Sequence, residues 1–274
     1  DLAAQRTFQA LPFFVAAVRR DPNFPSTGLA PVYSSLLTLL ALGASRGGAV
    51  YESSQILIEG LLVVGLNARD YRSLIADVEE LAGEGFGVDM IFWALDVIEA
   101  FMRNAAPDAS AREALMNRVL VRTSAIRTRL SSLQKAALWR LAEEFGWKLD
   151  ELDRSVDQTS NDNFASRLLG KKIAIYSLSE GASRQAKIAL ETAAPGAEVD
   201  CNADHVGSAR LRALAKNSDI FIIAWSAAKH SATDFIREHR GNRPLLYAQG
   251  KGFSSLLRAL EDHCRFVQGP AKER

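Results

Sequence analysis

Hydrophobic residues in the first half of the chain recur at every third or fourth position, as they do along one face of a helix. In residues 88–102, for example, Ile91, Leu95, Ile98 and Met102 keep this spacing. The strict apolar–polar alternation of a half-buried strand is almost absent before residue 170. The pattern therefore predicts an all-helical domain over residues 1–155, with helices at 1–20, 32–42, 49–64, 70–82, 88–104, 110–130 and 132–146.

Proline and capping residues predict where these helices begin and end. Pro12 predicts a break within the first helix, and residues 21–31 hold three of the eight prolines, which predicts a loop. Pro31 suits the first turn of the second helix, because its missing N–H would be unpaired there in any case. Ser110 followed by Glu113 predicts a capping box at the start of the sixth helix.

The pattern changes after a polar stretch at 153–166, and we place a linker at 156–170. Beyond it, short apolar runs predict strands at 173–177, 197–201, 220–225 and 245–248, with a last short strand at 266–267. Helical stretches lie between them at 182–194, 206–217, 231–239 and 253–263. Alternating strands and helices imply crossover connections and a parallel sheet. Residues 171–274 are therefore expected to form a small α/β domain of the Rossmann-like or flavodoxin-like kind.

The turns after the third and fourth predicted strands hold the residues best suited to a ligand. In an open parallel sheet, ligands bind at the edge where the carboxyl ends of the strands meet. A lysine can hold a phosphate as a point charge, and a histidine can donate a hydrogen bond or shuttle a proton. The fourth turn combines glycines, a lysine and hydroxyls at a helix start, like a phosphate cradle, but without P-loop spacing. The alternative is an ordinary pair of turns that close helices onto the sheet. We predict an anion or nucleotide site at Lys229, His230, Thr233, Gly250, Lys251, Gly252, Ser254 and Ser255.

The first two turns give weaker signals. The first, at 176–187, has serines and Gly181 before a helix but not the GxGxxG spacing, which disfavours a dinucleotide site. The second holds Asp204 next to His205, and an aspartate can orient a histidine or act as a base. A solvated loop in which Asp204 caps the next helix is the alternative. The candidate catalytic residues are therefore His230, Asp204 and His205, without a complete set of nucleophile, base and acid.

The overall composition, with 48% hydrophobic and 24% charged residues, is that of an ordinary globular protein. The net charge of +1 hides an asymmetry between the two halves. Residues 171–274 carry 16 Lys and Arg against 11 Asp and Glu, whereas residues 1–170 carry 17 against 21. A basic domain beside an acidic one suits an anionic ligand in the basic half, or the docking of the two halves.

Cysteine and histidine spacing bears on compartment and cofactors. Two cysteines without CxxC spacing favour a reducing, cytoplasmic compartment. The four histidines show neither HxH nor HExxH spacing, so no metal site is expected, and a nucleotide is the one cofactor left open. The apolar run at 57–66 contains Glu59 and is too short to span a bilayer, so no membrane partner is expected. Because the chain starts at Asp1 rather than Met, we expect it to be part of a longer protein.

Basic residues near the sixth predicted helix suggest a second surface. Arg118, Arg122 and Arg129 recur at near-helical spacing, and the stripe is either a solvated face or a surface for nucleic acid or a partner protein. Residues 141–155 follow the helix-turn-helix pattern loosely. The would-be recognition helix at 148–154 is acidic, however, and phosphates would repel it. All four tryptophans are interpreted as core residues rather than base-stacking platforms: Trp93, Trp139, Trp147 and Trp225.

Residues 218–262 resemble a bacterial domain of unknown function, the DUF2325 type. The resemblance is carried by Asp219 at a strand start, His230 at a helix start, Arg243-Pro244 before the next strand, and the turn at 252–255. It extends more weakly over residues 171–265 and implies a small Rossmann-like domain from bacterial multi-gene systems, without an established activity. The whole architecture also looks like components of phage-defence operons, which implies other protein subunits as partners. No family is identified from the helical half.

Three functions from different classes stay open. The first is a non-catalytic module that binds a nucleotide, an anion or a nucleic-acid backbone at the His230/Lys251 edge, within a defence-related complex. The second is a hydrolase acting on a phosphodiester or glycosidic bond. In that reading Asp204, His205 or His230 acts as acid or base, and Lys251 with the Ser254 turn stabilises negative charge. The third is a purely structural subunit that acts through its helical surface.

Overall fold

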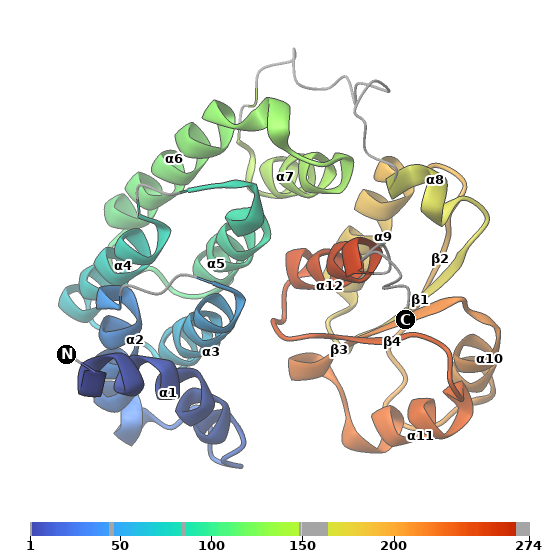
Figure 1. Ribbon diagram of the computed structural model, residues 1–274, viewed down its shortest axis with the longest axis horizontal. Helices are drawn as coiled ribbons and strands as arrows, with labels where there is room; N and C mark the ends of the chain where they lie inside the picture. Colours follow the sequence, from blue (N-terminus) through green and yellow to red (C-terminus); the bar gives the residue numbers. More distant parts are fainter. Residues whose placement is uncertain (1, 44–46, 84–85, 148, 150–163, 267–274) are drawn as a thin grey trace. The chain divides into compact units, whose positions relative to one another are not determined.

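The computed structural model describes residues 2–43, 47–83, 86–147, 149 and 164–266 (Figure 1). Contacts divide the chain into two compact units, Asp1–Arg127 and Thr128–Arg274, which are described one at a time. The predicted fold class is confirmed, since a helical region is followed by a parallel four-stranded sheet with helices. The expected domain limits stay a prediction, and the linker residues 156–163 lie outside the described residues.

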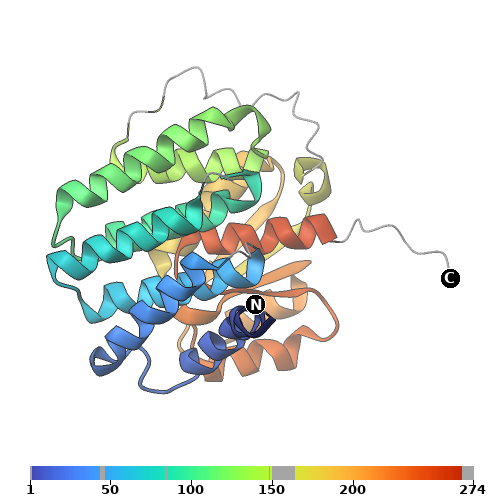
Figure 2. The same ribbon diagram turned by 60° about the vertical axis from the view of Figure 1, so that its left-hand side comes forward.

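The first unit is a stack of helices in two rows. Helix α2 packs on α4 and α4 on α6, whereas α3 packs on α5, so that alternate helices are neighbours. Contacts of α2 with α3 and of α5 with α6 join the rows, and Figure 2 shows the helices stacked side by side. Stacked helix pairs of this kind bury a continuous core between successive pairs. The helices are α1 (Leu2–Arg19), α2 (Ala30–Leu42), α3 (Gly48–Val64), α4 (Ala68–Ala82), α5 (Ile91–Arg103) and α6 (Ala109–Ala125), with 3₁₀ turns η1 (Thr27–Leu29) and η2 (Val88–Met90).

Helix α5 provides much of the core of this unit, because every residue from Ile91 to Phe101 is buried. Trp93, predicted as core, is 2% exposed, and its Nε1 donates to Ser54 Oγ of α3 at 3.1 Å. This bond satisfies the one polar group of the indole, which a buried tryptophan requires.

Two local predictions for this unit are wrong. Helix α1 continues through Pro12 to Arg19 instead of breaking there. The N-cap of α6 is Asp108, whose Oδ1 accepts from Ala111 N at 3.0 Å, so Ser110 does not start a capping box. The carboxylate of Asp108, two residues before Ser110, therefore caps the helix in place of the Ser110 hydroxyl.

The second unit is an open sheet in which all strand pairs are parallel. The strands are β1 (Lys172–Tyr176), β2 (Glu198–Asn202), β3 (Ile220–Ala224) and β4 (Leu245–Ala248), in the order β2-β1-β3-β4. Ile173 of β1 lies opposite Val199 of β2 and Ile220 of β3. The helices and 3₁₀ turns of this unit are η3 (Arg127–Arg129), α7 (Ser132–Phe145), α8 (Phe164–Leu168), α9 (Glu180–Ala193), α10 (Ala209–Asn217), η5 (Trp225–Ala227), α11 (His230–Arg240) and α12 (Phe253–Phe266).

Helices cover both faces of the sheet. Alternate residues of the strands, Ala174 and Tyr176 in β1 and Phe221 and Ile223 in β3, pack against α10 and α11 in one core cluster. Helices α9 and α12 cover the opposite face, and α7 packs on both of them (Figure 1). The strand predicted at 266–267 is wrong for Phe266, which ends α12, while Val267 lies outside the described residues.

Helix α7 is fixed to this unit through its first turn. Ser131 Oγ accepts from Gln134 N at 3.1 Å, and Gln134 Oε1 accepts from Ser131 N at 3.1 Å, which completes a capping box. Ser131 Oγ also donates to the buried carboxylate of Glu261 in α12, and Arg265 lies 2.9 Å from the same carboxylate. Helix α7 also packs along α9, where Arg140 Nε donates to Gln185 Oε1 at 2.8 Å, and these contacts group α7 with the sheet although its sequence continues the run of helices.

A buried guanidinium, that of Arg240 at the end of α11, holds the amino-terminal edge of the sheet together. It donates to the carbonyl oxygens of Ala215 at 3.0 Å, Ser218 at 2.6 Å, Asp219 at 2.8 Å and Pro244 at 2.8 Å. These acceptors belong to the end of α10 and the segments that lead into β3 and β4. Desolvation by burial lowers the pKa of Arg240 to about 10, which leaves the group charged at neutral pH.

Replacing Arg240 should destabilise the α/β unit severely. We expect Arg240→Met to lower the free energy of unfolding by about 3–5 kcal/mol, because several buried carbonyls lose their donor together. Urea unfolding followed by circular dichroism measures the loss. Arg243→Met is the matched comparison and should cost less, because Arg243 is exposed and its bonds to Lys216 O and Ser218 O lie at the surface of the same edge. Equal losses for the two variants would contradict the role assigned to Arg240.

Removing the Ser131 hydroxyl should loosen α7. Ser131→Ala is expected to lower the free energy of unfolding by about 1–2 kcal/mol, because the N-cap and one partner of Glu261 are lost together. Ser110→Ala is the control and should change it by less than about 0.5 kcal/mol, since Asp108 caps α6. A larger effect at Ser110 than at Ser131 would show that the caps are misassigned.

Candidate functional site

The carboxyl ends of the strands carry four turns at one edge of the sheet: turn 1 (177–179), turn 2 (203–208), turn 3 (225–229) and turn 4 (249–252). The strand order reverses between β1 and β3, which is where ligands bind in open α/β sheets. Here a backbone hydrogen bond crosses that position, from Leu178 N in turn 1 to Ala227 O in turn 3 at 2.7 Å. Turns 1 and 3 are thus joined directly, and this bond narrows the crevice that open α/β sheets usually have between the two strands where the order reverses.

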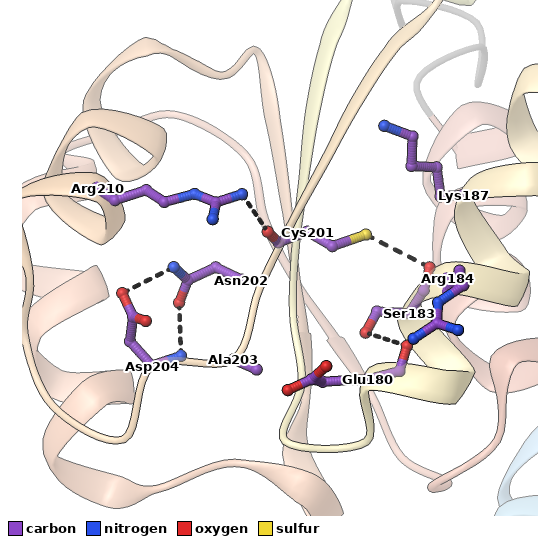
Figure 3. Close-up of a pocket in the computed structure, with 9 residues that line it drawn as sticks. All are labelled: Glu180, Ser183, Arg184, Lys187, Cys201, Asn202, Ala203, Asp204 and Arg210. Carbon is purple, nitrogen blue, oxygen red and sulfur yellow. Dashed lines mark hydrogen bonds between the residues drawn. The ribbon is translucent and has the colours of Figure 1, made fainter.

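An open pocket of about 380 Å³ lies beside the end of β2, between α9 and turn 2 (Figure 3). Its walls come from the first two turns of α9, from the last residues of β2 and from the start of α10. The pocket therefore occupies the β1–β2 half of the carboxyl edge, next to the position where the strand order reverses.

Three cationic side chains line this pocket. Arg184 and Lys187 extend from α9, and Arg210 extends toward them from α10 on the other side (Figure 3). Arg210 Nη2 donates to Cys201 O at 3.1 Å, and Lys187 Nζ lies 3.5 Å from the carboxylate of Glu191. Within the described part of the chain, neither arginine has an ion-pair partner. The two guanidinium groups are therefore available to an anion that enters between them.

Two carboxylates, those of Glu180 and Asp204, also line the pocket, and the second is already hydrogen-bonded. Asp204 accepts from Asn202 Nδ2 at 2.9 Å and from Ser208 Oγ, and these two bonds hold its pKa below the usual value. Among the described residues no hydrogen bond joins the Asp204 carboxylate to His205. Asp204 therefore shapes turn 2, and the catalytic role expected of Asp204 and His205 stays a prediction.

The residues predicted around turn 3 lie in an aromatic cluster. Trp225 in η5 has its ring centroid 6.2 Å from that of His230 and 5.6 Å from that of Tyr247 in β4. The guanidinium carbon of Arg237 lies 5.5 Å from the Trp225 centroid and 5.4 Å from the Tyr247 centroid. Trp225 is 36% exposed, so its interpretation as a core residue is wrong. We call these four side chains, Trp225, His230, Arg237 and Tyr247, the aromatic surface.

Turn 4 is closed by an internal bond. Gly250 N donates to Ser255 Oγ at 2.8 Å, so this amide and this hydroxyl are engaged with each other. Gly252 and Ser254 are buried as well, whereas Lys251 is exposed. In the turn predicted to hold a phosphate, the lysine side chain is therefore exposed, whereas Gly250, Gly252 and the two serines are buried.

Turns 3 and 4 are adjacent, as the expected strand pairing requires. Ser226 Oγ donates to Gln249 O at 3.0 Å, which ties one turn to the other. Lys229 and His230 are exposed at the start of α11, whereas Thr233 is 2% exposed and its hydroxyl donates to Lys229 O at 3.0 Å. The role of these residues in binding a ligand stays a prediction.

The arginine stripe predicted near the sixth helix is divided between elements. Arg118 and Arg122 lie one turn apart on α6, and Arg118 forms an ion pair with Glu79 of α4. Arg129 lies beyond the end of α6, in η3. The three side chains therefore do not share one helix, and their role as a binding surface stays a prediction.

The sequence prediction omits Arg184, Lys187 and Arg210 because it considers the turns but not the helices that follow them. Arg184 and Lys187 are three residues apart on α9 and share a helix face, and Arg210 is the second residue of α10. Pairing of β1 with β2 brings these two helix starts to the same edge. Basic residues in the first turns of helices that follow adjacent strands are the signal that identifies this pocket.

Metal-binding groups and membrane-spanning helices are two further features that would bear on function. No group of three or more His, Cys, Asp and Glu side chains in the described residues is arranged to hold a metal ion. In the same part of the chain, every helix is too short or too polar to cross a bilayer. The prediction of a cytoplasmic protein stays a prediction.

Comparison with known proteins identifies the family. Curated proteins and solved structures give no match to this chain. A family model described as DpdD-like matches residues 1–259, which covers both the helical unit and nearly all of the α/β unit. This match does not confirm the resemblance of residues 171–265 to the DUF2325 type. The chain belongs to the DpdD-like family, which comes from DNA-modification and defence gene clusters.

Proposed function

We propose that the protein is a non-catalytic component of a bacterial DNA-modification or defence system that binds a phosphate-bearing ligand at the carboxyl edge of its sheet. The observation that carries the proposal is the convergence of Arg184, Lys187 and Arg210 on one pocket. The ligand class is a nucleotide or the phosphate backbone of a nucleic acid.

The size and chemistry of the pocket support this ligand class. A volume of about 380 Å³ lies within the range of small-molecule sites, about 300–1,000 Å³. Guanidinium groups present planar pairs of donors that match phosphate oxygens, and a lysine adds a point charge. Of the two carboxylates, Asp204 is hydrogen-bonded to Asn202 and Ser208, which leaves Glu180. An incoming anion would meet two guanidinium groups and Lys187, which also lies 3.5 Å from Glu191.

The state of the polar groups in the pocket supports binding without catalysis. Desolvation raises the pKa of Cys201 to about 11, and its Sγ donates to Ser183 O at 3.4 Å, so the thiol is protonated at neutral pH. The lowered pKa of Asp204 makes that carboxylate a weak proton acceptor. A hydrolase that uses His230 with Lys251 remains the alternative, because both side chains are exposed on adjacent turns.

The helical unit suits a role in assembly. Its two rows of helices form an extended stack of the kind that binds other proteins along its length. Exposed apolar side chains on α1, including Phe13 at 80% and Phe14 at 53%, are consistent with contact to another subunit. A purely structural subunit would use this unit alone, and its carboxyl edge would bind no ligand.

Loss of one pocket arginine should weaken nucleotide binding. Arg210→Ala is expected to weaken ATP binding about tenfold, because a charged hydrogen-bond donor is removed. Isothermal titration calorimetry measures the affinity. Arg212→Ala is the matched control on the same helix, since the Arg212 guanidinium lies over the Phe235 ring at 5.6 Å.

The variants Lys251→Ala and His230→Ala test the alternative site and the alternative function. Binding lost in Lys251→Ala and kept in Arg210→Ala would move the site from the pocket to turn 4. Hydrolysis of ATP or of an oligonucleotide that disappears in His230→Ala would favour the enzyme. Absence of binding in the wild-type protein would leave the structural subunit.

The Cys201 thiol should be inert in the folded protein. Because a raised pKa keeps an acid protonated, we expect slow reaction with Ellman's reagent at pH 7 and rapid reaction of both cysteines after unfolding in guanidinium. Rapid labelling of one thiol in the native protein, absent from Cys201→Ser, would reveal a reactive thiolate and contradict the non-catalytic reading.

A further inference from the structure

The aromatic surface has a feature that the pocket does not explain. Trp225 is 36% exposed at the end of the central strand β3, although a side chain of its size is usually covered. Trp93 shows the ordinary case, since it is 2% exposed and its indole nitrogen is hydrogen-bonded inside the helical unit. An exposed indole at the ligand-binding edge of an α/β sheet is available to a partner.

The neighbours of Trp225 limit the orientations that its ring can adopt. Tyr247 and His230 meet it at interplanar angles of 80° and 71°, so both contacts are edge-to-face. Arg237 is fixed in turn, because its Nε donates to Tyr247 Oη at 2.9 Å and its Nη1 lies 3.3 Å from Asp234. A pre-oriented ring can bind a second flat group with little loss of side-chain entropy.

The charge around the aromatic surface favours an anionic partner. Lys229 is exposed and immediately precedes His230, and Lys251 is exposed on turn 4, which Ser226 ties to turn 3. The acids of α11 are Asp234, which is paired with Arg237, and Glu238. A stacking ring beside lysine side chains is the combination that single-stranded nucleic acids require, because their bases present flat faces and their phosphates follow nearby.

We propose that the aromatic surface binds single-stranded nucleic acid by stacking an unpaired base on Trp225, while Lys229 and Lys251 contact the adjoining phosphates. Duplex DNA is excluded as the preferred partner because its base faces are covered by neighbouring pairs. This inference rests on the proposed function in one respect, because both place a nucleic-acid-like ligand at the same edge. It uses the β3–β4 half of that edge, whereas the phosphate pocket uses the β1–β2 half.

Fluorescence anisotropy with labelled oligothymidylate and oligouridylate of about 15 nucleotides tests the stacking step. We expect Trp225→Ala to weaken both affinities about tenfold or more, and Trp225→Phe to stay within about threefold of wild type, because phenylalanine keeps a stacking face. An abasic strand of the same length should bind the wild-type protein as weakly as oligothymidylate binds Trp225→Ala. A difference between the two oligonucleotides decides between DNA and RNA as the preferred strand.

Further arms separate this inference from the proposed function. Trp225→Ala should bind ATP as wild type does, whereas Arg210→Ala should lose ATP affinity and keep the preference for oligothymidylate over the abasic strand. Base-dependent binding without ATP binding would support the stacking surface and reject the pocket. Three results would overturn the inference. Trp225→Ala could bind oligothymidylate as tightly as wild type does, or wild type could bind the abasic strand as tightly as oligothymidylate. The third is that wild type binds neither oligothymidylate nor oligouridylate at low salt.

Discussion

The α/β unit depends on a single buried cation, the guanidinium of Arg240, and on the carbonyls that it gathers. A charged group in a protein interior is stable only when its hydrogen-bond donors are used, and this one is paired with acceptors from four backbone positions. The acceptors lie near the end of α10 and in the segments that lead into β3 and β4. The relative positions of α10, α11, β3 and β4 therefore follow from one side chain at the amino-terminal edge.

Because the Arg240 bonds lie at the amino-terminal edge, the side chains of the carboxyl edge are not needed for them. Of the residues that carry the DUF2325-like resemblance, Asp219 accepts from Lys172 N at 2.8 Å and Arg243 donates to Lys216 O, so both stabilise the amino-terminal edge. His230 lies instead at the carboxyl edge, where the side chains differ from one half to the other. The β1–β2 half is a cationic pocket and the β3–β4 half is an aromatic surface. The residues that carry the resemblance therefore fall into two groups. Asp219 and Arg243 stabilise the sheet, whereas His230 is exposed where a ligand could contact it.

Much of the fold could be predicted from the sequence because apolar periodicity reports burial. The run IFIIA at 220–224 is buried throughout, and its position as a central strand follows from that pattern. The packing of α7 on the sheet unit could not be predicted in this way, since it depends on contacts with α9 and α12 that are distant in the sequence, such as the bond between Ser131 and Glu261, 130 residues apart. The exposure of Trp225 could not be predicted for a similar reason, because apolar neighbours along the chain do not show whether other elements cover a residue.

The predicted ligand residues and the pocket lie at the same edge of the sheet but in different halves of it, because the former belong to turns 3 and 4 and the latter lies beside turn 2. The carboxyl edge follows from strand–helix alternation alone, but the pocket depends on which strands are neighbours. Once β1 and β2 pair, Arg184 and Arg210 line the same pocket beside the end of β2, although 26 positions separate them in the sequence. Turn residues such as Gly250 and Ser255, which resembled a phosphate cradle, are bonded to each other instead.

Binding of a phosphate-bearing ligand among Arg184, Lys187 and Arg210 can be tested with a crystal structure of the protein soaked with ADP. We expect phosphate density beside the end of β2, within hydrogen-bond distance of at least one of the two guanidinium groups. Phosphate density at Lys251 and turn 4, with the pocket empty, would contradict it.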